Sequence, residues 1–194
     1  MSPTAVATPN ILTDPGYLFW APLSSAEPTN TVVGSVFTDS WPVAWLPMGA
    51  TEEGSQFNYS STVEPISVAE FFDPIRYATT ERSGNFAFSL TDITLATIKR
   101  ALNGGALSIV SGTGTTQLNK YEPPNPGSEV RSMIGWESLD NTVRIVARQC
   151  INAAEMSMAF AKAPGKSVIA CQFNFEKPAS AQPWAMWTAG TARA

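Results

Sequence analysis

The 194-residue sequence predicts a mainly β protein with one amphipathic helix. Two observations predict this class. Apolar and polar residues alternate over several short segments, and alternation of period two is typical of half-buried strands. The 15 prolines and 13 glycines are spread along the whole chain, which divides it into many short strands. The length fits one domain, or one domain with an extended arm.

Residues 1–30 are expected to form an extended N-terminal arm, because their five prolines limit any strand to a few residues. One short strand is expected within this arm, at 17–21. The valine-rich segment 31–38 predicts the next strand. A further strand is expected at 41–46, although Pro42 interrupts it.

A turn at 52–54 is expected to precede a strand at 56–62, where aromatic and polar residues alternate. A second strand is predicted around 66–68, bounded by prolines. Segments 76–80 and 85–90 predict a further hairpin. One face of its second strand carries large apolar side chains: Phe86, Phe88 and Leu90.

The clearest predicted helix covers 92–103, where apolar residues recur at helical spacing. Thr91 or Asp92 is expected to cap its first amides, and Asn103-Gly104 to supply a left-handed stop. Strands are expected again in the second half of the chain, with Gly112-Thr113-Gly114 as a turn and 123–127 as a loop. These strands are 106–111, 115–118, 131–138, 142–149, 156–162 and 167–176.

The resulting division is an arm at 1–30, a β domain at 31–176 and a C-terminal extension at 177–194. Trp184 and Trp187 lie in this extension, and we expect both to pack against their own domain.

The composition argues against an enzyme and against a bound cofactor or metal. Histidine is absent, which removes the usual proton shuttle, the Ser-His-Asp arrangement and nearly every zinc site. Cys150 and Cys171 have no metal-ligand spacing and are expected to be free, buried thiols. Charged residues make up 14% of the chain, well under the roughly 25% of an ordinary soluble protein. Such depletion is typical of subunits whose surfaces are covered by other copies.

Four patterns in the sequence could carry a chemical function, and each has a simpler interpretation. Glu52 and Glu53 could form a catalytic carboxylate pair, but neighbouring side chains in a strand or turn diverge. The glycines of 112–114 lack the lysine and the strand-to-helix context of a phosphate loop. Asp73, Glu70 and Glu81 match no cation-binding spacing. Six tryptophans and ten phenylalanines could stack on sugars, although core and interface packing is the more common role.

Charge is distributed unevenly along the chain. Residues 1–75 contain eight acidic residues and no lysine or arginine, a charge of −8, and the remainder carries +4. The two parts could neutralise each other within one chain or between copies placed head to tail. Clustered basic residues are missing, so nucleic-acid binding is not predicted. No apolar run approaches the roughly 20 residues that span a membrane, and the first ten residues lack a basic secretory pattern. We therefore expect a cytoplasmic site of synthesis.

Residues 45–105 contain a more specific pattern. Its pieces, in order, are Leu46-Pro47-Met48-Gly49-Ala50-Thr51-Glu52-Glu53-Gly54, Phe57-Asn58-Tyr59, Val68-Ala69-Glu70, Asp73-Pro74, Phe86-Ala87-Phe88, and the helix from Thr91 to Leu102. Together they resemble the major tail proteins, or tail tube subunits, of bacteriophages with long non-contractile tails.

This resemblance implies a β-sandwich or barrel-like domain flanked by one helix, assembled as hexameric rings stacked into a hollow tube in the virion tail. The implied partners are other copies of the chain, the tape measure protein in the lumen, the tail terminator and the tail-tip proteins. DNA would pass through without sequence-specific binding, which an acidic lumen favours. The N-terminal arm and one loop are the expected ring-to-ring contacts. The residues of that loop are Met48, Gly49, Thr51, Glu52, Glu53, Gly54, Phe57 and Tyr59.

Other classes of function remain open at this point. The chain could be another virion protein, such as a tail terminator, a head-decoration protein or a baseplate component. It could also be a carbohydrate-binding sandwich for host recognition, or a glycoside hydrolase that uses two carboxylates.

Overall fold

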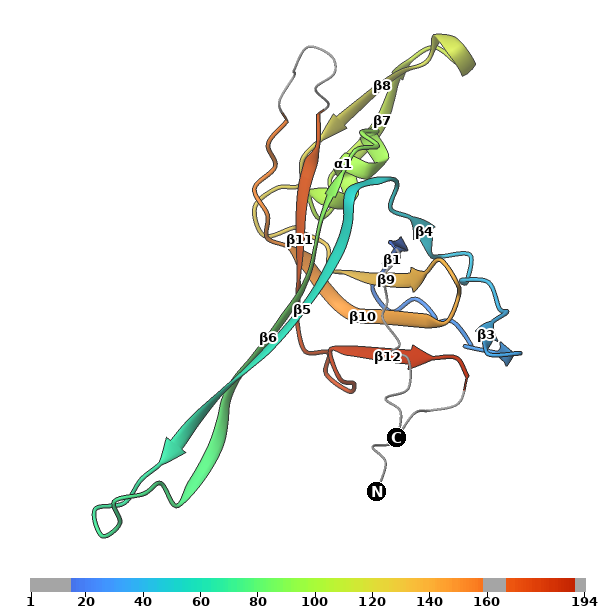
Figure 1. Ribbon diagram of the computed structural model, residues 1–194. Helices are drawn as coiled ribbons and strands as arrows, with labels where there is room; N and C mark the ends of the chain where they lie inside the picture. The colour runs from blue at the N-terminus through green and yellow to red at the C-terminus, as the bar shows by residue number, and fades with distance from the viewer. Residues whose placement is uncertain (1–14, 159–166, 191–194) are drawn as a thin grey trace.

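A computed structural model describes residues 15–158 and 167–190 (Figure 1). The fold is mainly β with a single helix among the described residues, as the sequence predicted. The longer strands and the helix are β1 (Gly16–Pro22), β5 (Thr51–Ile66), β6 (Arg76–Leu90), α1 (Leu95–Ala101), β7 (Ala106–Ser111), β8 (Leu118–Glu122), β9 (Ser132–Ser138), β10 (Val143–Asn152), β11 (Ile169–Phe175) and β12 (Trp184–Thr188). Three two-residue strands and one short 3-10 helix complete the list: β2 (Val32–Val33), β3 (Val36–Phe37), β4 (Leu46–Pro47) and η1 (Gly114–Thr116).

The main antiparallel sheet has the strand order β4-β1-β9-β10-β11-β6-β5, and β12 also pairs with β10. Strand β10 divides this sheet in two. Its first half, 143–147, lies between β9 and β12, whereas its end, 150–152, pairs with β11. A register shift between Ala147 and Cys150 marks the division. Because a bulge bends the strand that carries it, the two halves of the sheet can turn toward each other and enclose a core.

The main core fills the space between the two halves of the sheet. Phe86, Phe88 and Leu90 of β6 point into it, which confirms the predicted apolar face. They meet buried residues of β9, β10 and β11, among them Ile134 and Phe173, both with no exposed surface. A second, smaller cluster covers the opposite face of the β1-β9-β10 half: Ala21, Trp45, Met133 and Val146.

Helix α1 is shorter than the predicted 92–103, and its cap differs. Thr94, not Thr91 or Asp92, is the N-cap: its hydroxyl accepts from the Thr97 amide at 3.1 Å, and the Thr97 hydroxyl accepts from the Thr94 amide at 2.8 Å. This reciprocal pair satisfies amide donors that the start of a helix leaves open. Asn103 and Gly104 both have positive φ and end the helix as predicted.

The largest correction concerns residues 51–90, which form one long hairpin. The predicted turn at 52–54 lies within β5, where Gly54 has a φ of +86° beside a register shift between Thr51 and Ser55. Residues 76–80 and 85–90 are in a strand as predicted, but β6 runs without a break from Arg76 to Leu90, so they are not the two strands of a separate hairpin. Of the strand expected around 66–68, only Ile66 is in a strand, as the last residue of β5. Only 67–75 separates the two strands.

Three smaller corrections follow from turns. The strand predicted at 31–38 is the hairpin β2–β3, because Gly34 and Ser35 both have positive φ. Within 41–46 only Leu46 is in a strand, since the Trp45 amide donates to the Pro42 carbonyl at 2.8 Å and closes a turn. The strand predicted at 115–118 is η1 followed by the start of β8.

A further correction concerns the strand predicted at 156–162. Residues 156–158 are not in a strand, and the rest of that prediction, like residues 1–14 of the N-terminal arm, lies outside the described residues. The predicted strands at 106–111, 131–138, 142–149 and 167–176 correspond to β7, β9, β10 and β11, and 123–127 is a loop.

The C-terminal segment contains a strand that the sequence did not predict. β12 pairs with β10 in register from Val143↔Thr188 to Ala147↔Trp184. Trp184 packs on the main core and Trp187 on the smaller cluster, so both tryptophans bury part of their surface against their own domain, as expected.

Both cysteines are free and buried, as the sequence predicted. Burial raises the pKa of the Cys171 thiol to about 12, and burial likewise raises the pKa of Cys150 far above its ordinary range. Neither thiol is therefore ionised near neutral pH, which makes both poor nucleophiles. Among the described residues, no helix is long and apolar enough to cross a membrane.

Candidate functional site

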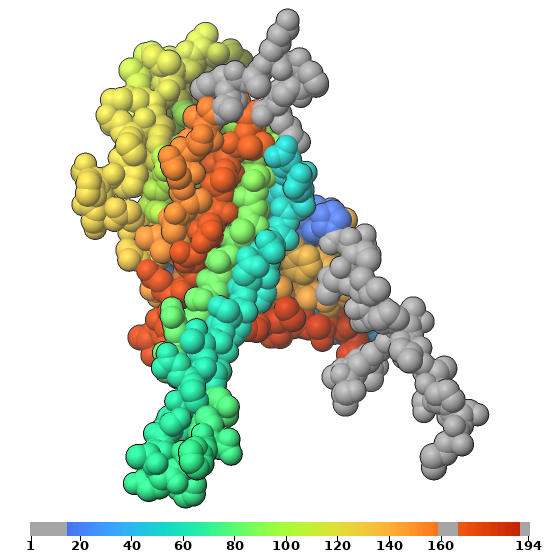
Figure 2. All heavy atoms as spheres, turned by 60° about the vertical axis from the view of Figure 1, so that its left-hand side comes forward, coloured from blue at the N-terminus to red at the C-terminus, as the bar shows by residue number. Residues whose placement is uncertain are grey.

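The most conspicuous surface feature is the outer half of the β5–β6 hairpin, residues 60–83, which we name the hairpin arm. It extends away from the body of the protein (Figure 1, lower left; Figure 2, bottom). Burial changes abruptly along β6: residues 84–90 alternate with Phe86, Phe88 and Leu90 inward, whereas nearly all of 76–83 is exposed. A two-stranded ribbon with no layer behind it is at best marginally stable in water, so the arm is typical of a segment that packs on a partner.

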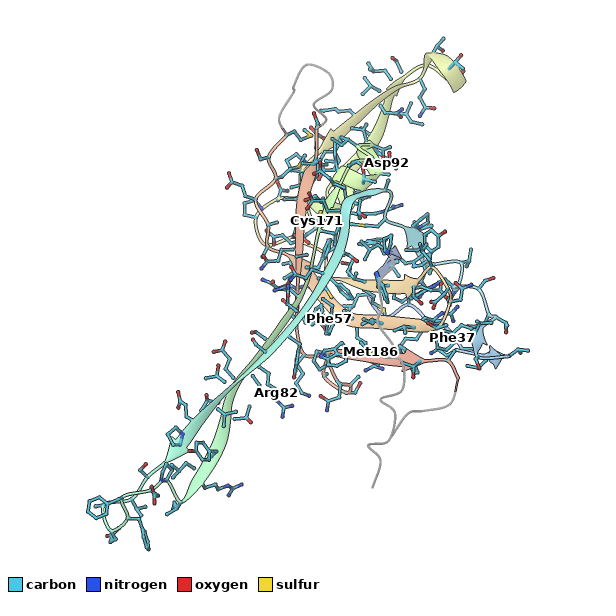
Figure 3. The ribbon with its side chains drawn as sticks, viewed as in Figure 1. Phe37, Phe57, Arg82, Asp92, Cys171 and Met186 are labelled. Carbon is cyan, nitrogen blue, oxygen red and sulfur yellow. The ribbon has the colours of Figure 1, made fainter. Side chains whose placement is uncertain are left out.

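An aromatic cluster anchors the arm to the body. The Phe57 ring lies 5.2 Å from Phe86 and 5.1 Å from Trp184, and the Tyr59 ring lies 5.3 Å from Trp184. These centroid distances are in the favourable range for aromatic pairs. Figure 3 shows Phe57 near the base of the hairpin arm and Arg82 farther out along it. The base is therefore held by the core and by β12, while the outer part has no such support.

The tip of the arm, residues 67–75, is apolar and exposed. Phe71 is 63% exposed, Phe72 is fully exposed at 110%, and Ile75 is 56% exposed. Tyr77, at the start of β6, is also 63% exposed. Single exposed apolar residues are common in proteins, but a contiguous group at the end of a projecting hairpin indicates an interaction site.

The eight predicted contact residues do not form one loop. Met48 is fully buried, and its amide donates to the Leu18 carbonyl at 2.8 Å, so it belongs to the core. Gly49, Thr51 and Gly54 are half-buried at the start of β5. Phe57 and Tyr59 belong to the anchoring cluster, and Glu52 and Glu53 are exposed on the strand.

Glu52 and Glu53 border a shallow depression of about 440 Å³ on the outer face of β5, β6 and β11. Its other walls are small or uncharged, including Gln56, Ala170 and Gln172. The depression is acidic at one side and neutral elsewhere. A surface of this kind does not attract phosphate groups.

A second hairpin, β7–β8, projects at the opposite end of the molecule from the arm (Figures 1 and 2). All six residues of β7 are exposed, including Leu107, Ile109 and Val110, and Leu118 of β8 is 56% exposed. The two projecting hairpins thus place exposed apolar residues at two opposite ends of the folded molecule.

A buried polar network that the sequence did not predict surrounds Arg144, whose side chain is 2% exposed. Its guanidinium donates to Glu137 at 2.7 Å and to the Asp39 carboxylate at 2.9 Å, and its carbon lies 4.6 Å from the Phe37 ring centroid. Trp41 also donates to Glu137, at 2.6 Å. The network ties the segment before β4 to β10, so its role is structural.

Two ion pairs join the acidic first part of the chain to the basic second part. Arg144 binds Asp39, and Arg148 holds Glu27 through two bonds of 2.6 and 3.2 Å. Internal neutralisation therefore accounts for some of the charge asymmetry. Four acidic residues of the hairpin and its tip, in contrast, form no ion pair with a described basic residue within 4 Å: Glu53, Glu64, Glu70 and Asp73.

The other candidate motifs are dispersed. Glu70 and Asp73 lie in the arm tip, Glu81 lies farther back along β6, and Gly112–Gly114 lie in the β7–β8 connection. Within residues 15–158 and 167–190, no three acidic or cysteine side chains are grouped as a metal site would require. No family model and no curated protein matches the chain.

Proposed function

We propose that the chain is the tail tube subunit of a long-tailed bacteriophage, a structural virion protein that polymerises as stacked hexameric rings by contact between identical copies. The observation that carries this proposal is the hairpin arm, which projects from a complete β domain with an unsupported ribbon and an apolar tip. The resemblance of residues 45–105 to major tail proteins is the basis for proposing this family. In this function the tube encloses the tape measure protein and later conducts DNA, and the tail terminator and tail-tip proteins close its ends.

The low charge content and the two projecting hairpins support an assembly role over a role as a free monomer. Edge strands with open backbone groups are a liability unless a partner covers them, and β5 is the edge of the main sheet. A subunit with exposed sites at different ends joins its copies head to tail, and such contacts close into rings or continue into filaments.

The direct test is electron microscopy of the purified, concentrated protein in negative stain, with the mass measured by light scattering. We expect hollow tubes or six-membered rings. A closed trimer would instead favour a head-decoration protein, and a single ring that never stacks would favour a tail terminator. A monomer that binds glycans would favour the carbohydrate-binding alternative.

Replacement of Glu53 by lysine, alone or together with Glu52→Lys, is expected to impair ring stacking and leave folding intact. The Glu53 carboxylate is exposed at the start of β5, so in the single variant the free energy of unfolding should change by about 0.5 kcal/mol or less. A reversed charge within an interface opposes association much more strongly. Tube yield is measured by sedimentation, and Glu155→Lys is the control because Glu155 is exposed but does not itself line the depression that Glu53 borders. Equal tube yields for Glu53→Lys and Glu155→Lys would remove residues 52–53 from the proposed interface.

A further inference from the structure

The molecule has an apolar groove at the end opposite to the hairpin arm. The groove has a volume of about 390 Å³ and lies between β1, α1 and β7. Its apolar walls are formed by Trp20, Leu46, Ala96, Leu107 and Val130. The volume is within the roughly 300–1,000 Å³ of pockets that enclose small organic groups, so the groove has room for an aromatic side chain.

The basic side chains of α1 line one side of this groove. Arg100 donates to the Pro47 carbonyl at 2.7 Å and lies 5.7 Å from the Trp20 ring centroid, which fixes its position in the wall. Lys99 is exposed beside it. From residue 95 to residue 122 the chain carries three basic residues and one acidic residue, a net charge of +2.

The arm tip has the complementary chemistry. Phe71 and Phe72 present two exposed rings, and from Glu64 to Arg76 the chain carries three acidic residues and one basic residue, a net charge of −2. An acidic aromatic tip and a basic apolar groove attract each other through both charge and apolar burial.

A tip cannot reach the groove of its own chain, since α1 and β7, which line the groove, lie far from the arm tip (Figure 1). Residues 60–66 are extended, and at about 3.3 Å per residue they carry the tip roughly 20 Å beyond the body. The contact therefore has to join two copies. Because the tip and the groove are different surfaces, each copy that uses both binds two neighbours, and the contact repeats.

We propose that Phe71 and Phe72 at the arm tip of one copy insert into the groove between β1, α1 and β7 of a second copy, with Glu70 and Asp73 toward Lys99 and Arg100. This inference rests on the proposed function in that it identifies the surfaces through which the subunits polymerise. It covers the exposed rings of the tip and the exposed Leu107 of the groove.

A disulfide trap tests the contact in the full-length chain. The double variant Ala69→Cys/Ala96→Cys places one thiol on the tip and one on the groove, keeps the tip rings and Leu107, and the native cysteines are buried. Mild oxidation is expected to give a ladder of covalent oligomers on a non-reducing gel. The matched control is Ala69→Cys/Val43→Cys, because Val43 is 97% exposed but lies outside the groove. No ladder from the tip–groove pair, or an equal ladder from the control, would overturn the proposal.

Complementary variants provide a second readout. Phe71→Ser/Phe72→Ser removes the tip rings, and Leu107→Lys places a charge in the groove. Each variant alone is expected to reduce the assembled fraction about tenfold or more, since a few central aromatic residues dominate most interfaces. Mixing the two should restore association, because the tip of one variant and the groove of the other are intact. A tip variant that assembles like the unmodified protein, or a mixture that stays unassociated, would contradict the contact.

The two proposals fail separately. A disulfide ladder from oligomers that are not tubes would keep the tip–groove contact and remove the tail tube function. Hollow tubes without a ladder would keep the tail tube function and remove this contact.

Discussion

Replacement of Arg144 by methionine is expected to lower the free energy of unfolding by about 3–5 kcal/mol, which is the usual cost of removing one partner from a buried ion pair. The substitution leaves the carboxylates of Glu137 and Asp39, which are 8% and 13% exposed, without their cation. It also removes the contact with the Phe37 ring. Because a domain is stable by only about 5–15 kcal/mol, this loss is severe. Urea denaturation followed by tryptophan fluorescence measures it.

Arg148→Met is the matched control for this prediction. Arg148 binds Glu27 through two bonds, but its side chain is 21% exposed and that of Glu27 is 30% exposed. Water screens this pair, so we expect a loss of about 1 kcal/mol. Equal losses for the two variants would show that burial does not set the importance of Arg144.

The same network predicts a dependence of stability on pH. Burial acts to raise the pKa of Asp39, but hydrogen bonds from Thr29 and Asn30 and the charge of Arg144 outweigh it and hold the pKa below the ordinary value. A depressed carboxyl pKa stabilises the fold above the unfolded-state pKa, and this contribution is lost as the pH falls through the folded-state value. The difference in stability between the unmodified protein and Arg144→Met should therefore shrink below about pH 4. A constant difference from pH 7 to pH 3 would contradict this account.

Replacement of Gly135 by valine is expected to have the second-largest effect on stability. Gly135 lies in β9, and a Cβ at this position would overlap the ring of Trp41 and come within 2.9 Å of Trp45. Overfilling a packed site costs about 1–3 kcal/mol. Displacement of Trp41 would also break its bond to Glu137, which adds about 1–3 kcal/mol for a buried acceptor left open.

Thermal unfolding measures the effect of Gly135→Val. For a protein of this size, a loss of this magnitude lowers the melting temperature by roughly 10 °C. Thr79→Val is the control, since it introduces the same side chain into an exposed part of β6. A Gly135→Val variant that melts together with the Thr79→Val control would show that the two indole rings move aside at little cost.

The sequence predicted most of the strands of the body, because burial on one face imposes a visible alternation. Phe86, Phe88 and Leu90 are the clearest example. The hairpin arm has no buried face, so its sequence has no comparable alternation to indicate a strand. Pro65 was predicted to bound a strand, whereas it lies inside β5. An edge strand tolerates proline because its outer side donates to no neighbour.

Some features had a local signal that was given too little weight. Gly34 in the middle of the valine-rich segment indicates the turn of β2–β3, and Thr94 followed three residues later by Thr97 indicates the true helix start. The Arg144 network had no local signal, because Asp39 and Arg144 are 105 residues apart in the sequence. The groove likewise combines β1, α1 and β7, and only the folded chain brings them together.

The pairing of β10 has a consequence for how the protein is made. Its neighbours are β9, which comes before it, and β11 and β12, which follow it. Strand β1, in turn, pairs with β9, more than 100 residues later. Contacts so distant in sequence make folding slow and keep it from finishing on a partial chain. We therefore expect the body to complete its sheet only after β12 has been synthesised, so that a shorter nascent chain does not yet present the finished surfaces.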